Sequence, residues 1–214
     1  MEIILADKIG EAQGLRILEV VGEGGVIAFP TDTSYALGVD PRNERALKKL
    51  FEIKGRDEDK AILLLIDSLS MATTYSEATR YFAEVASFFW PGPLTLVLPA
   101  SPKVSNLVTA DRSTVGLRWP DHPLITKLIA RLGHPLTGTS ANLSGKEPAR
   151  SASDVVAGFG ETVDLVIDGG SSPLKSQSTL LDLTGNTPNI LREGSISYEV
   201  LAQFFNGRIE RLGV

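Results

Sequence analysis

The spacing of hydrophobic residues along the chain predicts alternating helices and strands. Residues 11–21 carry apolar side chains at helical spacing, and the glycine-rich turn at 22–25 should end this helix before an apolar strand at 26–29. Asn43 is placed to cap a second helix, and the apolar run at 62–66 is typical of a strand covered on both faces. Further strands are predicted at residues 95–98, 115–118, 165–167, 179–183 and 190–192, and further helices at 77–88, 123–132, 153–159 and 198–205.

This alternation predicts the α/β class. Because the later strands cluster, we expect a twisted mixed β-sheet with helices packed on its faces. A chain of 214 residues with 43% hydrophobic residues is long enough to bury a sizeable core, and short enough that we expect one domain over residues 1–214.

The composition and the charge limit the kinds of site that the chain can carry. It contains no cysteine, which excludes disulfides, thiolate nucleophiles and cysteine-ligated metals. Its two histidines, His122 and His134, each precede a proline, and we interpret both as packing or surface residues. The formal net charge of −5 argues against a surface built as a whole to bind nucleic acid. An anion site must therefore be a local cluster of basic residues.

The sequence shows no sign of membrane insertion. No apolar run approaches the roughly 20 residues that a spanning helix needs, and the start Met1-Glu2 lacks the basic region of a signal peptide. We therefore expect a cytoplasmic protein without membrane contact.

Two polar segments follow short apolar runs. Residues 30–38 come directly after a predicted strand, where α/β proteins concentrate their binding groups, although Asp32 could equally organise a local turn. Residues 137–145 offer hydroxyls, an amide and glycines that suit phosphate oxygens. This second segment lacks the spacing of a Walker A loop, and the glycines at 22–25 precede their strand. Both familiar nucleotide-binding motifs are therefore excluded.

Basic residues supply the candidate anion site. Lys54, Arg56 and Lys60 lie within seven residues, and they could hold a polyphosphate or pair with the acidic residues between them. Arg118 and Arg192 stand at the ends of predicted strands. Arg118 suits a carboxylate and Arg192 a phosphate or an adenine ring, but each could also be an exposed ion-pair partner.

In order and spacing, these segments resemble the YrdC-type threonylcarbamoyl-AMP synthase family along nearly the whole chain. The motifs that carry the resemblance are Pro-Thr-Asp-Thr-x-Tyr-x-Leu-Gly at 30–38, Lys-x-Arg at 54–56, Pro-Gly-Pro-x-Thr at 91–95, the strand of Arg118, Ser-Ala-Asn at 140–142 and Leu-Arg-Glu-Gly at 191–194. The resemblance implies condensation of L-threonine, bicarbonate and ATP into threonylcarbamoyl-AMP, with release of pyrophosphate. Attack on the α-phosphorus needs charge neutralisation and alignment more than a proton-transfer residue, so the scarcity of histidine is no obstacle.

The resemblance also implies roles for individual residues. The threonine site would comprise Thr33, Arg118 and the backbone near Gly138. The residues implied for ATP are Arg56, Lys60, Thr114, Ser140, Asn142 and Arg192. Lys54 and Arg56 would form the catalytic pair, with Lys54 and Asn142 supporting the phosphate region. Mg²⁺ is expected to bind mainly through ATP oxygens, with no protein metal ligand.

The implied partners are ATP, L-threonine and bicarbonate, together with tRNA or double-stranded RNA. A downstream enzyme would transfer the threonylcarbamoyl group to tRNA, beside the anticodon.

The chain departs from the family pattern after the basic motif. Many members carry two prolines and a histidine where this chain has Asp57, Ala61 and Leu65, and the histidine position bears on threonine binding. Two alternatives stay open. One is a YciO-like paralogue, which shares the fold and the Pro-Thr-Asp start. The other is an RNA-binding module without turnover, for which salt-sensitive RNA binding without ATP use would be the sign.

Overall fold

The strands form two mixed sheets in the computed structural model, which describes residues 1–55, 57, 59–172 and 177–211. The five-stranded sheet has the spatial order β1 (Glu2–Leu5), β9 (Leu165–Asp168), β2 (Ile27–Phe29), β3 (Ala36–Gly38) and β8 (Thr139–Ser140). The seven-stranded sheet has the order β12 (Glu210–Arg211), β11 (Asn189–Arg192), β10 (Thr179–Asp182), β5 (Leu94–Pro99), β6 (Thr114–Arg118), β4 (Leu64–Leu65) and β7 (Leu136–Thr137).

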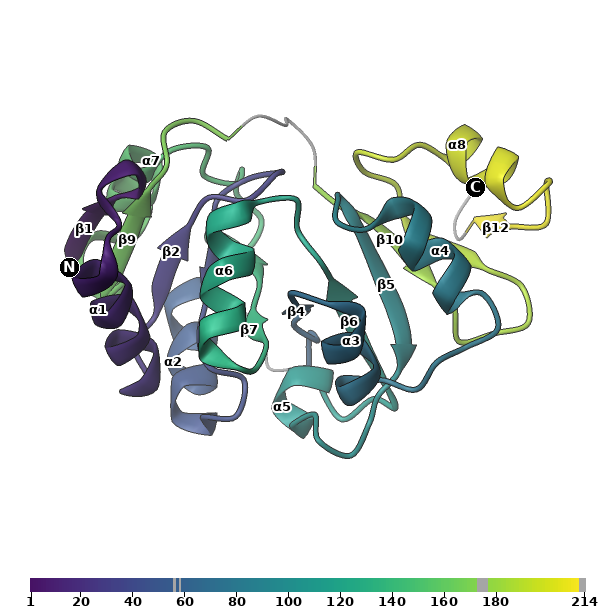
Figure 1. The fold of residues 1–214 in the computed structure, drawn as a ribbon, viewed down its shortest axis with the longest axis horizontal. Helices are drawn as coiled ribbons and strands as arrows, with labels where there is room; N and C mark the ends of the chain where they lie inside the picture. The colour runs from purple at the N-terminus through teal and green to yellow at the C-terminus, as the bar shows by residue number, and fades with distance from the viewer. Residues whose placement is uncertain (56, 58, 173–176, 212–214) are drawn as a thin grey trace.

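Helices accompany both sheets. They are α1 (Glu11–Gly22), α2 (Glu44–Lys54), α3 (Leu69–Tyr75), α4 (Phe82–Phe89), α5 (Asn106–Thr109), α6 (Pro123–Leu132), α7 (Ala152–Phe159) and α8 (Tyr198–Phe204), with short 3-10 turns at Ala6–Lys8 and Gly160–Thr162. Figure 1 shows α1 and α7 beside the strands of the five-stranded sheet on the left, and α4 and α8 beside the seven-stranded sheet on the right. No helix of the described residues is both long and apolar enough to cross a membrane.

Strand β2 shows why the five-stranded sheet is covered on both faces. Successive side chains of a strand point to opposite faces, and Ile27 and Phe29 join a core cluster with α1 and α6. Ala28, between them, joins the larger core cluster, to which α2 and α7 also contribute. All three residues are fully buried. An uninterrupted apolar strand is therefore what this position requires.

Local signals in the sequence explain several helix ends. The Asn43 side chain accepts a hydrogen bond from the backbone N–H of Ala46 and so caps α2, as predicted. Helix α2 ends at Lys54 and is followed by Gly55, whose φ of 55° lies in the left-handed region that favours glycine. Helix α6 begins with Pro123, where a missing backbone N–H costs nothing.

The predicted α/β class is confirmed, and most predicted elements are present. The helix predicted at 77–88 starts later, as α4, and α3 precedes it. The predicted strand at 62–66 has only two residues in the ladder, β4. The strands that were not predicted are β1, β3, β7, β8 and β12, and all of them except the four-residue β1 have two or three residues. Strands this short contain too few positions to show an alternating pattern.

Candidate active site

A cleft of about 570 Å³ lies between residues of the two sheets, within the usual range for small-molecule sites. One wall of the cleft is one face of the seven-stranded sheet. Along β6, the alternate residues Thr114, Gly116 and Arg118 line it, because side chains two apart share a face. The register places Leu65 of β4 beside Arg118, and Val97 of β5 beside Gly116.

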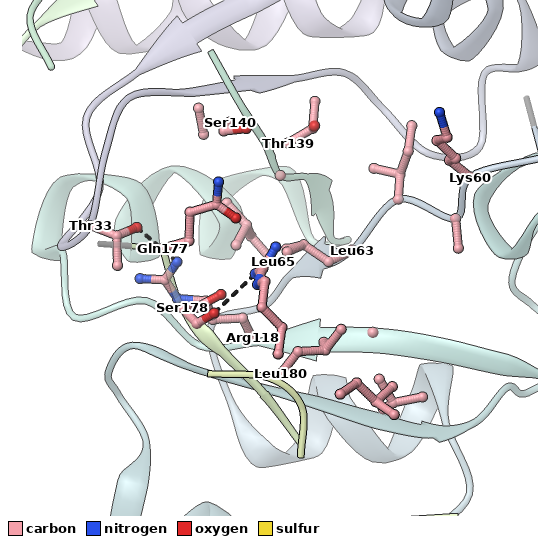
Figure 2. A pocket seen from close by; sticks show the side chains of 18 of the residues that line it. Thr33, Lys60, Leu63, Leu65, Arg118, Thr139, Ser140, Gln177, Ser178 and Leu180 are labelled. Carbon is pink, nitrogen blue, oxygen red and sulfur yellow. Dashed lines mark hydrogen bonds between the residues drawn. The ribbon is translucent and has the colours of Figure 1, made fainter. Parts of the chain in front are cut away.

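The opposite wall comes from the five-stranded sheet and its loops. It consists of Thr31, Thr33, Ser34, Ala36, Gly138, Thr139 and Ser140. Figure 2 shows Thr139 and Ser140 on one side of the cavity and Leu180 on the other, with Thr33 and Lys60 at opposite ends. A Cβ atom on Gly138 would lie 2.6 Å from Cγ of Leu65. The bare Cα of Gly138 therefore allows the two walls to meet.

Arg118 sits at the buried end of the cleft, with 5% of its side chain exposed. Its Nε donates to the carbonyl of Gly92 at 3.1 Å, and its Nη1 donates to Oγ1 of Thr33 at 3.0 Å. Its Nη2 donates to Oδ1 of Asp32 at 2.5 Å. Guanidinium has five N–H donors, so two remain beyond these bonds between described residues. The geometry thus fixes the plane of the guanidinium and leaves donors for an anionic group.

The hydroxyl of Thr33 is oriented by its neighbours. The hydroxyl of Thr31 donates its single hydrogen to the carbonyl of Ser34 at 2.7 Å. In the 3.0 Å contact between the two threonine hydroxyls, Thr33 must therefore be the donor. Since Oγ1 of Thr33 also accepts from Arg118, it can meet a ligand only as an acceptor. This position suits the N–H of an amine or ammonium group.

The rim of the cleft is exposed and carries cations. Lys60, Arg112 and Arg192 line it, all three exposed to solvent. Nζ of Lys60 lies 3.0 Å from Oδ2 of Asp57, and Arg112 donates to the carbonyl of Asp59 at 3.3 Å. Among the described residues that line the cleft, these three cations outnumber the one carboxylate, that of Asp182, even without Arg118 at the buried end. In a protein of net charge −5, this local excess of positive charge fits a polyphosphate.

Lys54 and Asn142 organise the loop behind Ser140. Lys54 is buried, and its Nζ donates to the carbonyls of Ser140 and Asn142 at 2.5 and 2.8 Å. The amide nitrogen of Asn142 donates to the carbonyls of Leu143 and Lys146 at 2.9 and 2.8 Å. Oδ1 of Asn142 accepts the hydroxyl hydrogen of Ser140 at 2.5 Å. Ser140 consequently faces the cleft as a hydrogen-bond acceptor.

The structure brings most of the residues predicted from the sequence to this one cleft. Those that line it are Thr33, Lys60, Thr114, Arg118, Gly138, Ser140 and Arg192. Lys54 and Asn142 are not among the lining residues, and Arg56 lies outside the described residues. The function predicted for each of these residues stays a prediction.

Sequence reasoning missed several lining residues. Ser178 and Asp182 line the cleft with Leu180, because the three alternate along and just before β10. Pairing of β10 with β5 sets Leu180 beside Thr95 and Asp182 beside Val97. The alternation of side chains between two faces follows from the strand predicted at 179–183. Which of the two faces lines the cleft is shown only by the order of the strands in the sheet. Gln177 and Arg112 follow no pattern that marks them.

The described residues offer no dedicated metal cage. They contain no group of three or more histidine, aspartate or glutamate residues that could hold a metal ion. Asp182, the carboxylate in the described lining, already accepts from the backbone N–H and the hydroxyl of Thr184 at 2.8 and 2.7 Å. A hard cation at this cleft would have to bring most of its oxygen ligands with it.

The chain is similar to known proteins over most of its length. It is 39% identical over 180 residues to the Pyrococcus abyssi protein named threonylcarbamoyl-AMP synthase, a match that covers 84% of this chain and 53% of the relative. The chain thus spans about half the length of that relative. The crystal structure of P. abyssi Sua5 complexed with L-threonine matches with a TM-score of 0.93 and 36% identity, over 99% of this chain and 62% of that one. E. coli YciO matches with a TM-score of 0.82 and 30% identity, over 91% and 95%.

A family model covers the segment that builds the cleft. The Sua5/YciO/YrdC model, described as "Telomere recombination", matches residues 19–194. This range includes both walls and the rim, from Thr31 to Arg192. Because the match spans far more than half of the sequence and the fold agrees, the chain belongs to the Sua5/YciO/YrdC family.

Proposed function

We propose that the chain is an L-threonylcarbamoyladenylate synthase, a nucleotidyltransferase that condenses L-threonine, bicarbonate and ATP. The similarity to the P. abyssi synthase over 84% of this chain supports the proposal. The similarity to a structure complexed with L-threonine supports the choice of amino acid.

The observation that carries the proposal is that one cleft combines a buried end suited to an amino acid with a cationic rim suited to a polyphosphate. At the buried end, Arg118 retains N–H donors for a carboxylate, and Thr33 presents an acceptor for an amine. The exposed rim carries Lys60, Arg112 and Arg192 for a polyphosphate. The described lining of one cavity therefore offers groups for an amino acid at one end and for a polyphosphate at the rim.

The chemistry follows in two balanced steps. The amine nitrogen of threonine forms a bond to the carbon of bicarbonate with net loss of water, which gives a carbamate. A carbamate oxygen then bonds to the α-phosphorus of ATP as the bond to the pyrophosphate oxygen breaks. The second step moves no proton, so the work of the protein is to hold the two substrates in line and to stabilise the charge on the phosphates. The cations of the rim are suited to that work.

We propose that Mg²⁺ arrives bound to ATP oxygens, since the described cleft lining supplies the carboxylate of Asp182 and no cluster of acidic groups. When bound, the ion neutralises phosphate charge. We further propose that the product serves an enzyme that transfers the threonylcarbamoyl group to tRNA, and that the protein works in the cytoplasm with tRNA as the final acceptor.

A second candidate is a YciO-like nucleotide-binding paralogue that does not use threonine. Leu65 favours it, because a buried leucine, 2% exposed, lines the amino-acid end at the position where many family members carry histidine.

Pyrophosphate release distinguishes the two candidates. The purified protein would be incubated with ATP, Mg²⁺, bicarbonate and each amino acid in turn, with omission of each component as the control. A synthase releases pyrophosphate only when threonine and bicarbonate are both present. Measurable ATP binding with no release for any amino acid would reject the synthase and support the YciO-like candidate. Salt-sensitive RNA binding without ATP use would instead support an RNA-binding module.

A further inference from the structure

Asp32 lies behind the cleft, in a pair with Arg118. Its side chain is 11% exposed, and its Oδ1 accepts from Nη2 of Arg118 at 2.5 Å. Its Oδ2 is buried and has no hydrogen-bond partner among the described residues. Thr31 and Thr33, on either side, line the cleft, whereas Asp32 does not. Asp32 is therefore placed to contact Arg118, and not a ligand in the cleft.

The pair sets both the charge and the direction of the Arg118 guanidinium. Arginine stays protonated even when it is buried, so a cation that is only 5% exposed needs a nearby counter-charge. The carbonyl of Gly92 and the hydroxyl of Thr33 are neutral acceptors, so Asp32 alone of these three partners supplies that charge. An Arg118 without Asp32 would lose one of three anchors and would be drawn toward any anion in the cleft.

The imidazole of His122 does not compete with Arg118 for the charge of Asp32 at neutral pH. Burial lowers the pKa of His122 below its ordinary value of 6.5, although the charges of Asp32 and Asp121 oppose the shift. His122 is therefore neutral near pH 7, and the carboxylate of Asp32 is left to balance Arg118.

We propose that Asp32 is a positioning residue for the amino-acid substrate: it fixes the guanidinium of Arg118 so that the two remaining donors point at the carboxylate of the amino acid. The inference rests on the proposed function and deepens it. The Asp32–Arg118 pair is electrically neutral, so the buried end recognises its ligand by the direction of hydrogen bonds. The rim, by contrast, attracts phosphates by net charge.

The chain offers a matched control in Asp40. Its side chain is also 11% exposed, and it also pairs with an arginine at 2.8 Å, although this arginine, Arg42, is 57% exposed. Nε2 of His134 also lies 3.6 Å from Oδ2 of Asp40. Asp40 and Arg42 do not line the cleft. Asp32→Asn and Asp40→Asn therefore remove the same charge from equally exposed carboxylates. Only the first of them is paired with an arginine that lines the proposed substrate site.

The test measures KM and kcat for threonine and ATP by pyrophosphate release, and threonine binding by calorimetry. Asp32→Asn should raise the KM for threonine at least about tenfold, because it leaves the buried charge of Arg118 without a counter-charge. The KM for ATP should change by less than about twofold, and Asp40→Asn should leave both KM values unchanged. Asp32→Glu keeps the charge and should fold even if Asp32→Asn does not. Its KM for threonine should lie between those of the wild type and Asp32→Asn.

Three results would overturn the positioning role. They are an unchanged KM for threonine in Asp32→Asn, an equal rise in Asp40→Asn, and an equal rise in the KM for ATP. If the wild type binds threonine but releases no pyrophosphate, the proposed function fails. The affinities of the wild type, Asp32→Asn and Asp32→Glu for threonine then still decide the role of Asp32.

Discussion

The buried end of the cleft and its exposed rim handle charge in different ways. At the buried end, Arg118 is 5% exposed, and its charge is balanced by Asp32 at 2.5 Å. At the rim, half of the Lys60 side chain is exposed, and cations outnumber acids among the described lining residues. Salt screens the attraction between exposed charges, and it screens buried pairs much less. The difference suggests that the buried end selects the amino acid and the rim supplies affinity for the nucleotide.

The largest effect should come from removing the guanidinium of the buried end. Arg118→Ala leaves Asp32 buried without a counter-charge, so we expect a loss of about 3–5 kcal/mol in the free energy of unfolding, and no threonine-dependent turnover. Denaturant unfolding and pyrophosphate release measure the two effects. Arg131→Ala is the control, because Arg131 pairs with Glu11 at the surface, where 38% and 79% of the side chains are exposed. Near-normal turnover in Arg118→Ala would contradict the role of the buried end.

A smaller effect should follow from separating the two walls. Gly138→Ala places a Cβ atom 2.6–2.9 Å from three carbons of Leu65, and overpacking of this kind costs about 1–3 kcal/mol. In a Leu65→Ala background, Gly138→Ala should cost less than it does in the wild type, because the carbons that the new Cβ atom would meet are absent. Gly158→Ala, which meets nothing within 4 Å, is the control. If Gly138→Ala costs the same in the wild type and in Leu65→Ala, the two walls do not meet as described.

At the rim, single charges should matter less. Lys60→Ala and Arg112→Ala should each raise the KM for ATP about threefold to tenfold and leave the KM for threonine and the melting temperature nearly unchanged. Raising the ionic strength should weaken ATP binding in the wild type more than in these variants. Lys8→Ala, which removes an exposed cation away from the cleft, is the control. A rise in the KM for threonine as large as that for ATP would contradict the separate roles of the buried end and the rim.

The smallest effect should be a pH dependence of stability at the buried end. Because burial lowers the pKa of His122 below 6.5, the folded protein binds this proton less tightly than the unfolded chain does. The free energy of unfolding should therefore decrease as the pH falls below about 6.5, down to the lowered pKa. In His122→Asn this part of the decrease should be absent. Melting temperatures between pH 8 and pH 5 measure it, and identical profiles for both proteins would exclude His122 as its source.

The sequence predicts more of the fold than of the site geometry. Helix α2 could be placed from Asn43 and its apolar face, because both signals are local. The alternation of Thr114, Gly116 and Arg118 is also visible in the sequence, but which face meets the cleft depends on the sheet order.

Contacts between distant residues were beyond the reach of local patterns. Asp32 and Arg118 are 86 positions apart, and Lys54 reaches the carbonyls of Ser140 and Asn142 across 86 and 88 positions. The resemblance to a family gathered the right segments, and seven of the ten residues that it singled out line the cleft. It did not indicate that Arg118 is paired with Asp32, because a motif names residues and not the bonds between them.

Direct detection of the product tests the central claim, that one cleft joins an amino acid to an adenylate. The protein would be supplied with ATP, Mg²⁺, threonine and carbon-13-labelled bicarbonate, and the products would be identified by mass spectrometry. We predict a threonylcarbamoyl adenylate that carries the label, formed in step with pyrophosphate. Pyrophosphate without a labelled adenylate, or an adenylate that forms equally well without threonine, would contradict the account.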